Sequence, residues 1–132
     1  VPILGLEIAV LSGNRRTADF NSNLLKDSGL YTSGMWYPTC IQRHLGGASS
    51  LLRRYDEARE NYKEAFRICI EMNFRPELAL THLDFAELLL DHFPKEKAEA
   101  IEHLDFAIKE FREMKMQPSL ERALRRKDIL KA

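Results

Sequence analysis

The chain lacks an excess of charge of either sign. Its 132 residues include 20 Lys and Arg and 20 Asp and Glu, so the formal net charge is zero. Without a net charge, no long-range field attracts the protein to nucleic acid or to an anionic membrane. We therefore expect a partner that is recognised through local contacts.

Long hydrophobic runs are also missing. The longest, Ile3-Leu4-Gly5-Leu6, is interrupted at Glu7 and resumes only as far as Leu11. A helix that crosses a bilayer needs about 20 apolar residues. No basic segment precedes this run and no small-residue cleavage site follows it, so it does not have the pattern of a signal peptide. The sequence predicts no membrane segment.

Cysteine is scarce, with Cys40 and Cys69 alone in the chain. Both fall at helical positions among apolar residues, where an unpaired thiol behaves as a small hydrophobic side chain. We expect buried free thiols rather than a disulfide, which fits a reducing cytoplasm. The chain opens on Val1-Pro2 without a methionine, which suggests a segment of a longer protein.

What the chain does have is an internal repeat. The segment from Glu71 to Leu78 returns 42 residues later as Glu113 to Leu120, with Met and Pro at matching positions. Upstream, small and large residues recur at the same spacing: Ala58, Tyr62, Ala65 and Phe66 return as Ala100, Leu104, Ala107 and Ile108. Periods of this size are typical of stacked helical hairpins. Because such arrays offer an extended face to a partner, we expect binding and not catalysis, so the protein is predicted not to be an enzyme.

Apolar periodicity and turn residues predict seven helices and an all-α fold. The first two cover residues 3–12 and about 15–26, and residues 27–37 are predicted to form a loop. The third begins at Pro38 and ends near Arg53, and the fourth begins at Tyr55. Three further helices open near prolines, which the first turn of a helix tolerates: Pro76, Pro94 and Pro118. We expect a single domain with hairpins over about 3–26, 38–73 and 76–115 and a capping helix over 118–131.

The first predicted helix is apolar on nearly every side. A helix of this kind must be covered, and only seven charged residues occur among the first 50. We expect an upstream repeat or a second subunit to cover it. The candidate oligomer interface comprises Leu4, Leu6 and Val10.

Two residue patterns, each of which occurs twice in the chain, are similar to those of a known family. A large residue precedes a small one in Leu45-Gly46 and Phe85-Ala86, and small-x-x-x-large-x-x-small occurs in Ala58-Tyr62-Ala65 and Ala100-Leu104-Ala107. These spacings resemble the tetratricopeptide repeat, with a weaker copy at Ala18, Ser22 and Leu25. The resemblance implies antiparallel hairpins stacked in a right-handed superhelix.

Longer phrases resemble the C-terminal helical region of large bacterial signalling proteins. They are Arg54-Tyr55-Asp56-Glu57-Ala58, Arg75-Pro76-Glu77-Leu78-Ala79 and Leu83-Asp84-Phe85-Ala86, and the match covers roughly residues 5 to 130. Nucleotide-cyclase-like proteins, signal-transduction ATPases and transcriptional activators carry such regions. The resemblance implies a regulatory module whose effector domain lies upstream.

Motifs for chemistry are absent. No two histidines among His44, His82, His92 and His103 are four residues apart, as ligands on one helix would be. Gly46-Gly47 lacks the lysine of a phosphate-binding loop. We therefore predict no catalytic residue, no metal, no cofactor and no small-molecule substrate.

The resemblance places one candidate set on the inner face of the array. The predicted partner-binding residues are Arg43, Leu80, Leu83, Glu87, Arg122 and Arg125. Apolar and charged positions of both signs suit a peptide or helix. An alternative is that Leu80 and Leu83 simply pack within the stack. Trp36 and Tyr37 are either an interface pair or a plug for the predicted loop.

These observations leave three candidate functions. The first is a protein-interaction or regulatory module of a multidomain signalling or transcription-regulatory protein. The second is self-association through the apolar first helix. The third, nucleic-acid binding through Arg122, Arg125, Arg126 and Lys127, is opposed by the neutral chain and by neighbouring acidic residues.

Overall fold

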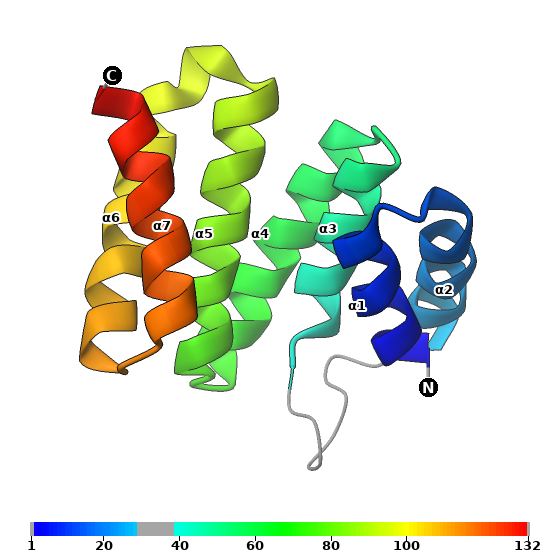
Figure 1. Ribbon diagram of the computed structural model, residues 1–132. Helices are drawn as coiled ribbons and strands as arrows, with labels where there is room; N and C mark the ends of the chain where they lie inside the picture. Colours follow the sequence, from blue (N-terminus) through cyan, green and yellow to red (C-terminus); the bar gives the residue numbers. More distant parts are fainter. Residues whose placement is uncertain (1, 29–38, 132) are drawn as a thin grey trace. The chain divides into compact units, whose positions relative to one another are not determined.

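The computed structural model describes residues 2–28 and 39–131, with the side chains of residues 2–5, 27 and 28 left out. Over these ranges the chain is all-α and contains no strand (Figure 1). Its helices are α1 Pro2–Ser12, α2 Arg15–Ser28, α3 Ile41–Leu51, α4 Tyr55–Glu71, α5 Arg75–His92, the 3₁₀ turn η1 Pro94–Glu96, α6 Lys97–Glu113 and α7 Gln117–Lys131. The predicted class and the seven α-helices are confirmed.

Several predicted boundaries are wrong by a few residues. Helix α3 begins at Ile41, because Cys40 before it is extended, and Pro38 lies outside the described residues, as do Trp36 and Tyr37. Helix α3 ends at Leu51, because Arg53 has a left-handed backbone with φ of 62°. Pro94 opens the short turn η1, and α6 begins only at Lys97.

The turn after a helix is part of the repeat. Asn73 and Lys115, which are 42 residues apart, both have positive φ, 51° and 56°. At Arg53 and at Lys115 the next amide donates to the carbonyl five residues back, from Arg54 to Ser49 and from Met116 to Phe111. This is the hydrogen-bond pattern of the Schellman motif, in which the residue that follows a right-handed helix has a left-handed backbone. It ends these two helices without a glycine.

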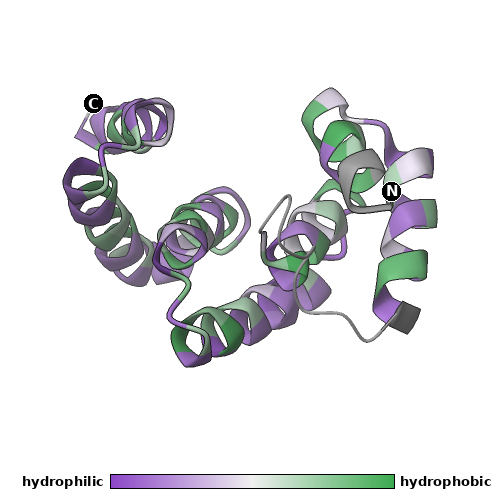
Figure 2. Cartoon of the chain, turned by 90° about the horizontal axis from the view of Figure 1, so that it is seen from below, coloured by the Kyte–Doolittle hydropathy of each residue, from purple (hydrophilic) through white to green (hydrophobic). Residues whose placement is uncertain are grey.

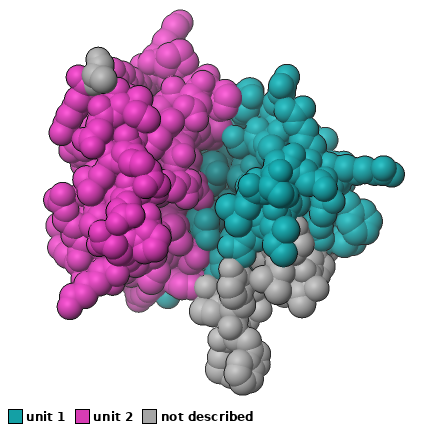
Figure 3. All heavy atoms as spheres, viewed as in Figure 1, with its two compact units in different colours: residues 1–72 teal, residues 73–132 magenta. Residues whose placement is uncertain are grey.

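The chain consists of two compact units, residues 1–72 and 73–132 (Figure 3). In the first, α1 packs on α2 and α3, α2 packs on α3, and α3 packs on α4. In the second, α5 packs on α6, and α7 packs on both. The first two predicted hairpins belong to the first unit, and the third hairpin with the final helix belongs to the second. The prediction of a single folding domain stays a prediction.

In the first unit, a glycine lets two helices approach closely. A Cβ atom placed on Gly46 of α3 would lie 2.6 Å from a ring carbon of Tyr62 on α4. Contacts of that length do not occur between real side chains, so any residue larger than glycine must displace the ring. The core of this unit further contains Leu6, Ala9, Ala18, Leu25, Ile41, Leu45 and Ala48.

The core of the second unit follows the predicted small and large positions. Ala100, Leu104 and Ala107 of α6 are all fully buried. The core cluster comprises Ala79, Leu83, Ala86, Leu104, Ala107, Ile108, Phe111 and Ala123. Small residues permit close helix approach while the large ones fill the space between them.

Two composition-based predictions concern the described residues. Both cysteines are buried, and neither forms a disulfide. Within residues 2–28 and 39–131, no helix is long and apolar enough to span a bilayer.

Candidate functional site

Large apolar side chains project from the first hairpin. Ile8 and Leu11 of α1 are 65% and 82% exposed, and Phe20 and Leu24 of α2 are 64% and 47% exposed. Residues three or four apart are neighbours on a helix surface, so each helix carries an apolar pair. Figure 2 shows green, hydrophobic segments in the chain near its N-terminus, whereas the helix that ends at the C-terminus is mostly purple. We call these four residues the N-terminal apolar residues.

The predicted oligomer interface falls on other side chains of the same helix. Leu6 is fully buried inside the unit, and Val10 packs partly against the same core. The side chain of Leu4 lies outside the described residues. Leu6 therefore has no surface to offer a partner, because α2 and α3 already cover that side of α1. The side open to a partner carries Ile8 and Leu11.

Two of the predicted partner-binding charges pair within the chain. Arg122 of α7 lies 2.9 Å from Asp84 Oδ1 and 2.5 Å from Glu87 Oε1 of α5. Burial raises the pKa of Glu87, with Arg122 opposing the rise. Burial alone would lower the pKa of Arg122, but the two carboxylates outweigh it and raise it. The group holds α7 to α5.

The remaining predicted residues have different surroundings. Leu83 is fully buried and Leu80 packs against the same core, as expected if both pack within the stack. Arg43 contacts Thr39 and His44 through its guanidinium, at 3.5 and 3.3 Å. Arg125 is exposed. The structure thus brings Leu80, Leu83, Glu87 and Arg122 together in one unit, but as parts of its own packing.

A histidine pair escaped the sequence analysis. The Nδ1 atoms of His82 on α5 and His103 on α6 are 2.7 Å apart, and the His82 ring lies 4.1 Å from the ring of Phe106 between centroids. Burial, with a further effect of His103, lowers the pKa of His82 to about 4. Burial also lowers the pKa of His103 against the opposing effect of Glu99. The two are 21 residues apart, so no local spacing could reveal them.

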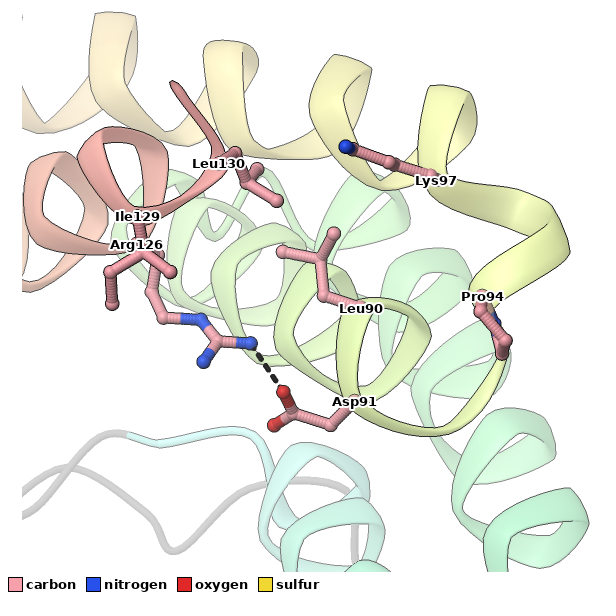
Figure 4. A pocket seen from close by; sticks show the side chains of 7 residues that line it. All are labelled: Leu90, Asp91, Pro94, Lys97, Arg126, Ile129 and Leu130. Atoms are coloured by element: carbon pink, nitrogen blue, oxygen red, sulfur yellow. Dashed lines mark hydrogen bonds and ion pairs between the residues drawn. The ribbon is translucent and has the colours of Figure 1, made fainter. Parts of the chain in front are cut away.

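A pocket of about 300 Å³ lies in the second unit (Figure 4). It is lined by the end of α5, the turn η1, the start of α6 and the end of α7. Four apolar residues, Leu90, Pro94, Ile129 and Leu130, share the wall with Asp91, Lys97 and Arg126. We call it the end pocket. Sequence analysis missed it because its residues come from four elements.

Among the described residues, no group of three His, Cys, Asp or Glu side chains is placed to hold a metal ion. Comparison of the chain with protein family models, with curated proteins and with solved structures finds no match. The function is therefore inferred from the exposed apolar residues, the charged groups and the pocket of this chain.

Proposed function

We propose that this protein is a non-catalytic protein-interaction module of the tetratricopeptide-like type. In this proposal the hairpins stack in a right-handed superhelix, and the module serves a larger bacterial signalling or transcription-regulatory protein in the cytoplasm. The repeated residues with their resemblance, and the two buried thiols that form no disulfide, support this setting. The partner is a protein or a peptide.

The observation that carries the proposal is the exposure of the N-terminal apolar residues. Single exposed apolar side chains are normal on a monomer, whereas larger exposed apolar surfaces mark interaction sites, and this hairpin exposes two neighbouring pairs of large apolar side chains. The same two helices bury Leu6, Ala18 and Leu25 on their other sides. Covering Ile8, Leu11, Phe20 and Leu24 would remove their apolar area from water and favour association.

Site-specific photo-crosslinking in the cells that make the protein tests this proposal. A photoreactive residue at Leu11 should give one discrete adduct, whereas the same residue at Lys109, exposed on α6, should not. Ile8→Glu should abolish the adduct, because a carboxylate would be buried against an apolar partner. Asn23→Glu, an exposed change on the same hairpin, should keep it. Equal labelling from Leu11 and Lys109 would rule out the proposal.

Self-association is a second candidate, favoured by the same exposed pairs on α1 and α2. A patch on one subunit can be covered by the same patch on a second. The adduct from Leu11 would then have twice the mass of the chain. Light scattering across a concentration series should show a dimer that Ile8→Glu dissociates. A monomer at all concentrations would exclude this candidate and leave a different protein as the partner.

A further inference from the structure

We propose that the end pocket binds an apolar carboxylate, a ligand with a short hydrocarbon part and one negative charge. This inference does not depend on the interaction surface of the first unit. It follows from the shape of the pocket, from its apolar wall and from two cationic side chains.

The size and the wall suit a small amphipathic molecule. About 300 Å³ is at the lower end of the volumes of small-molecule sites, which are mostly apolar with a few polar groups that fix orientation. Figure 4 shows Leu90 and Leu130 pointing toward each other at the centre of the pocket. Ile129 borders the pocket, although its side chain is 66% exposed. A ligand that covered these groups would remove apolar area from water.

The charged groups favour a single negative charge. Arg126 Nη2 lies 2.6 Å from Asp91 Oδ1, so these two charges compensate each other. Lys97 lines the pocket, and its ammonium group forms no ion pair or hydrogen bond among the described residues. The pocket therefore has one uncompensated positive charge, which a carboxylate neutralises. A second negative charge would face Asp91 without a partner.

An unpaired donor points to the same ligand. Arg126 Nε is buried and has no hydrogen-bond acceptor among the described residues. A buried N–H group without an acceptor is costly, and such groups are rare in native proteins. A carboxylate has two oxygens and several lone pairs. In the pocket, the guanidinium group of Arg126 and the ammonium group of Lys97 both line the wall, so a carboxylate there meets donors of positive charge.

The test is NMR titration of the protein with hexanoate, with hexanol as the matched probe that lacks the charge. Hexanoate should shift the methyl signals of Leu90, Ile129 and Leu130 but not those of Leu6, with a dissociation constant of roughly 1 mM for so small a ligand. Lys97→Gln should weaken hexanoate binding about threefold, as expected for an exposed ion pair. Lys95→Gln, a charge-matched control in the neighbouring turn η1 that does not line the pocket, should not.

A second variant keeps the test decisive. Ile129→Glu replaces part of the apolar wall by a negative charge at an exposed site, so it should fold normally and bind hexanoate at least tenfold more weakly. Equal shifts with hexanol and hexanoate, or no effect of Lys97→Gln, would overturn the proposal.

The same chemistry occurs in a free carboxylic acid and at the C-terminal residue of a peptide. Acetyl-glycyl-leucine as the free acid separates the two sources. Tighter binding of hexanoate would assign the pocket to a free acid, and tighter binding of the dipeptide would assign it to a chain end.

Discussion

The two units differ in the side chains that they expose to solvent. Of the seven large hydrophobic side chains that are exposed in the described residues, the first unit carries six, and the second carries only Ile129. In the second unit, ion pairs connect α7 to α5 and α6, and Arg75 pairs with Glu110 and Glu113 of α6. In the first, ion pairs between helical segments join Lys26 to Glu57 and Arg54 to Asp19.

This difference suggests a division of roles. Surface ion pairs contribute little stability each, but they keep a helix surface solvated and polar. The second unit is covered in this way, and of its large hydrophobic side chains among the described residues only Ile129 is exposed. The first leaves apolar side chains in water, where a partner could cover them.

The same substitution should have its largest and its smallest effect in different units. Phe111 of α6 is fully buried, and Phe111→Ala should destabilise the fold by about 3–5 kcal/mol, since it leaves a cavity. Phe20 of α2 is 64% exposed, and Phe20→Ala should change stability by less than about 0.5 kcal/mol. Urea unfolding measures the free energy of unfolding of both variants. Comparable losses of stability would contradict the predicted difference between the two sites.

The histidine pair should make stability depend on pH. Because the pKa of His82 is about 4 in the folded chain and 6.5 without burial, the unfolded chain binds an extra proton between these values. This contribution of His82 should be absent above about pH 7, should lower stability as the pH falls from 6.5 to 4, and should be complete below about pH 4. The loss should be up to about 3 kcal/mol.

A pair of variants isolates this effect. His82→Gln should flatten the pH dependence of the free energy of unfolding relative to the parent chain. His92→Gln changes an exposed histidine of the same helix and serves as the matched control. If both variants follow the parent curve, burial of His82 does not govern acid sensitivity.

The close approach of α3 and α4 predicts that Gly46→Ala destabilises the protein when the Tyr62 ring is present and stabilises it when the ring is removed. Gly46→Ala should cost about 1–2 kcal/mol, because the new methyl group overlaps the Tyr62 ring. In a Tyr62→Leu background the same change should stabilise by about 0.5–1 kcal/mol, because alanine favours a helix over glycine. The second unit already has this combination, with Ala86 and Leu104 at the corresponding positions. A double-mutant cycle by urea unfolding gives the coupling, and independent effects would contradict the packing.

Ion pairs should matter slightly more in the second unit. Arg122→Met removes the cation from two carboxylates that are only 13% and 24% exposed, Asp84 and Glu87. Since Arg122 itself is 44% exposed, a loss of about 1 kcal/mol is expected. Arg67→Met removes pairs within α4, where Arg67 is 52% exposed, and should cost about 0.3 kcal/mol. Thermal unfolding at low and high salt compares them, and a larger loss for Arg67→Met would reverse the comparison.

Much of the fold could be predicted from the sequence, because helix periodicity and the 42-residue repeat are local signals. The small and large positions Ala58, Tyr62 and Ala65 were predicted, and all three are buried. Helix ends were less accurate, because Arg53 adopts a left-handed backbone that favours glycine and that its sequence did not indicate.

The candidate sites were harder to predict. The sequence indicated an apolar first helix, but which side faces inward depends on how α2 and α3 pack against it. It therefore selected Leu6, which is buried, instead of Leu11, which is exposed. Glu87 and Arg122 were expected to meet a partner, but α7 returns along α5 and pairs them with each other.

The sequence by itself determined the all-α class, the number of helices and the small and large residues of each core, because these follow from spacing along one chain. The tertiary structure alone decided which charges on different helices are paired, which apolar side chains stay in water, that His82 contacts His103, and that Lys97 and Arg126 line one pocket. Such contacts join residues about 20 to 40 positions apart. Their geometry depends on how whole helices pack, and local periodicity carries no information about that.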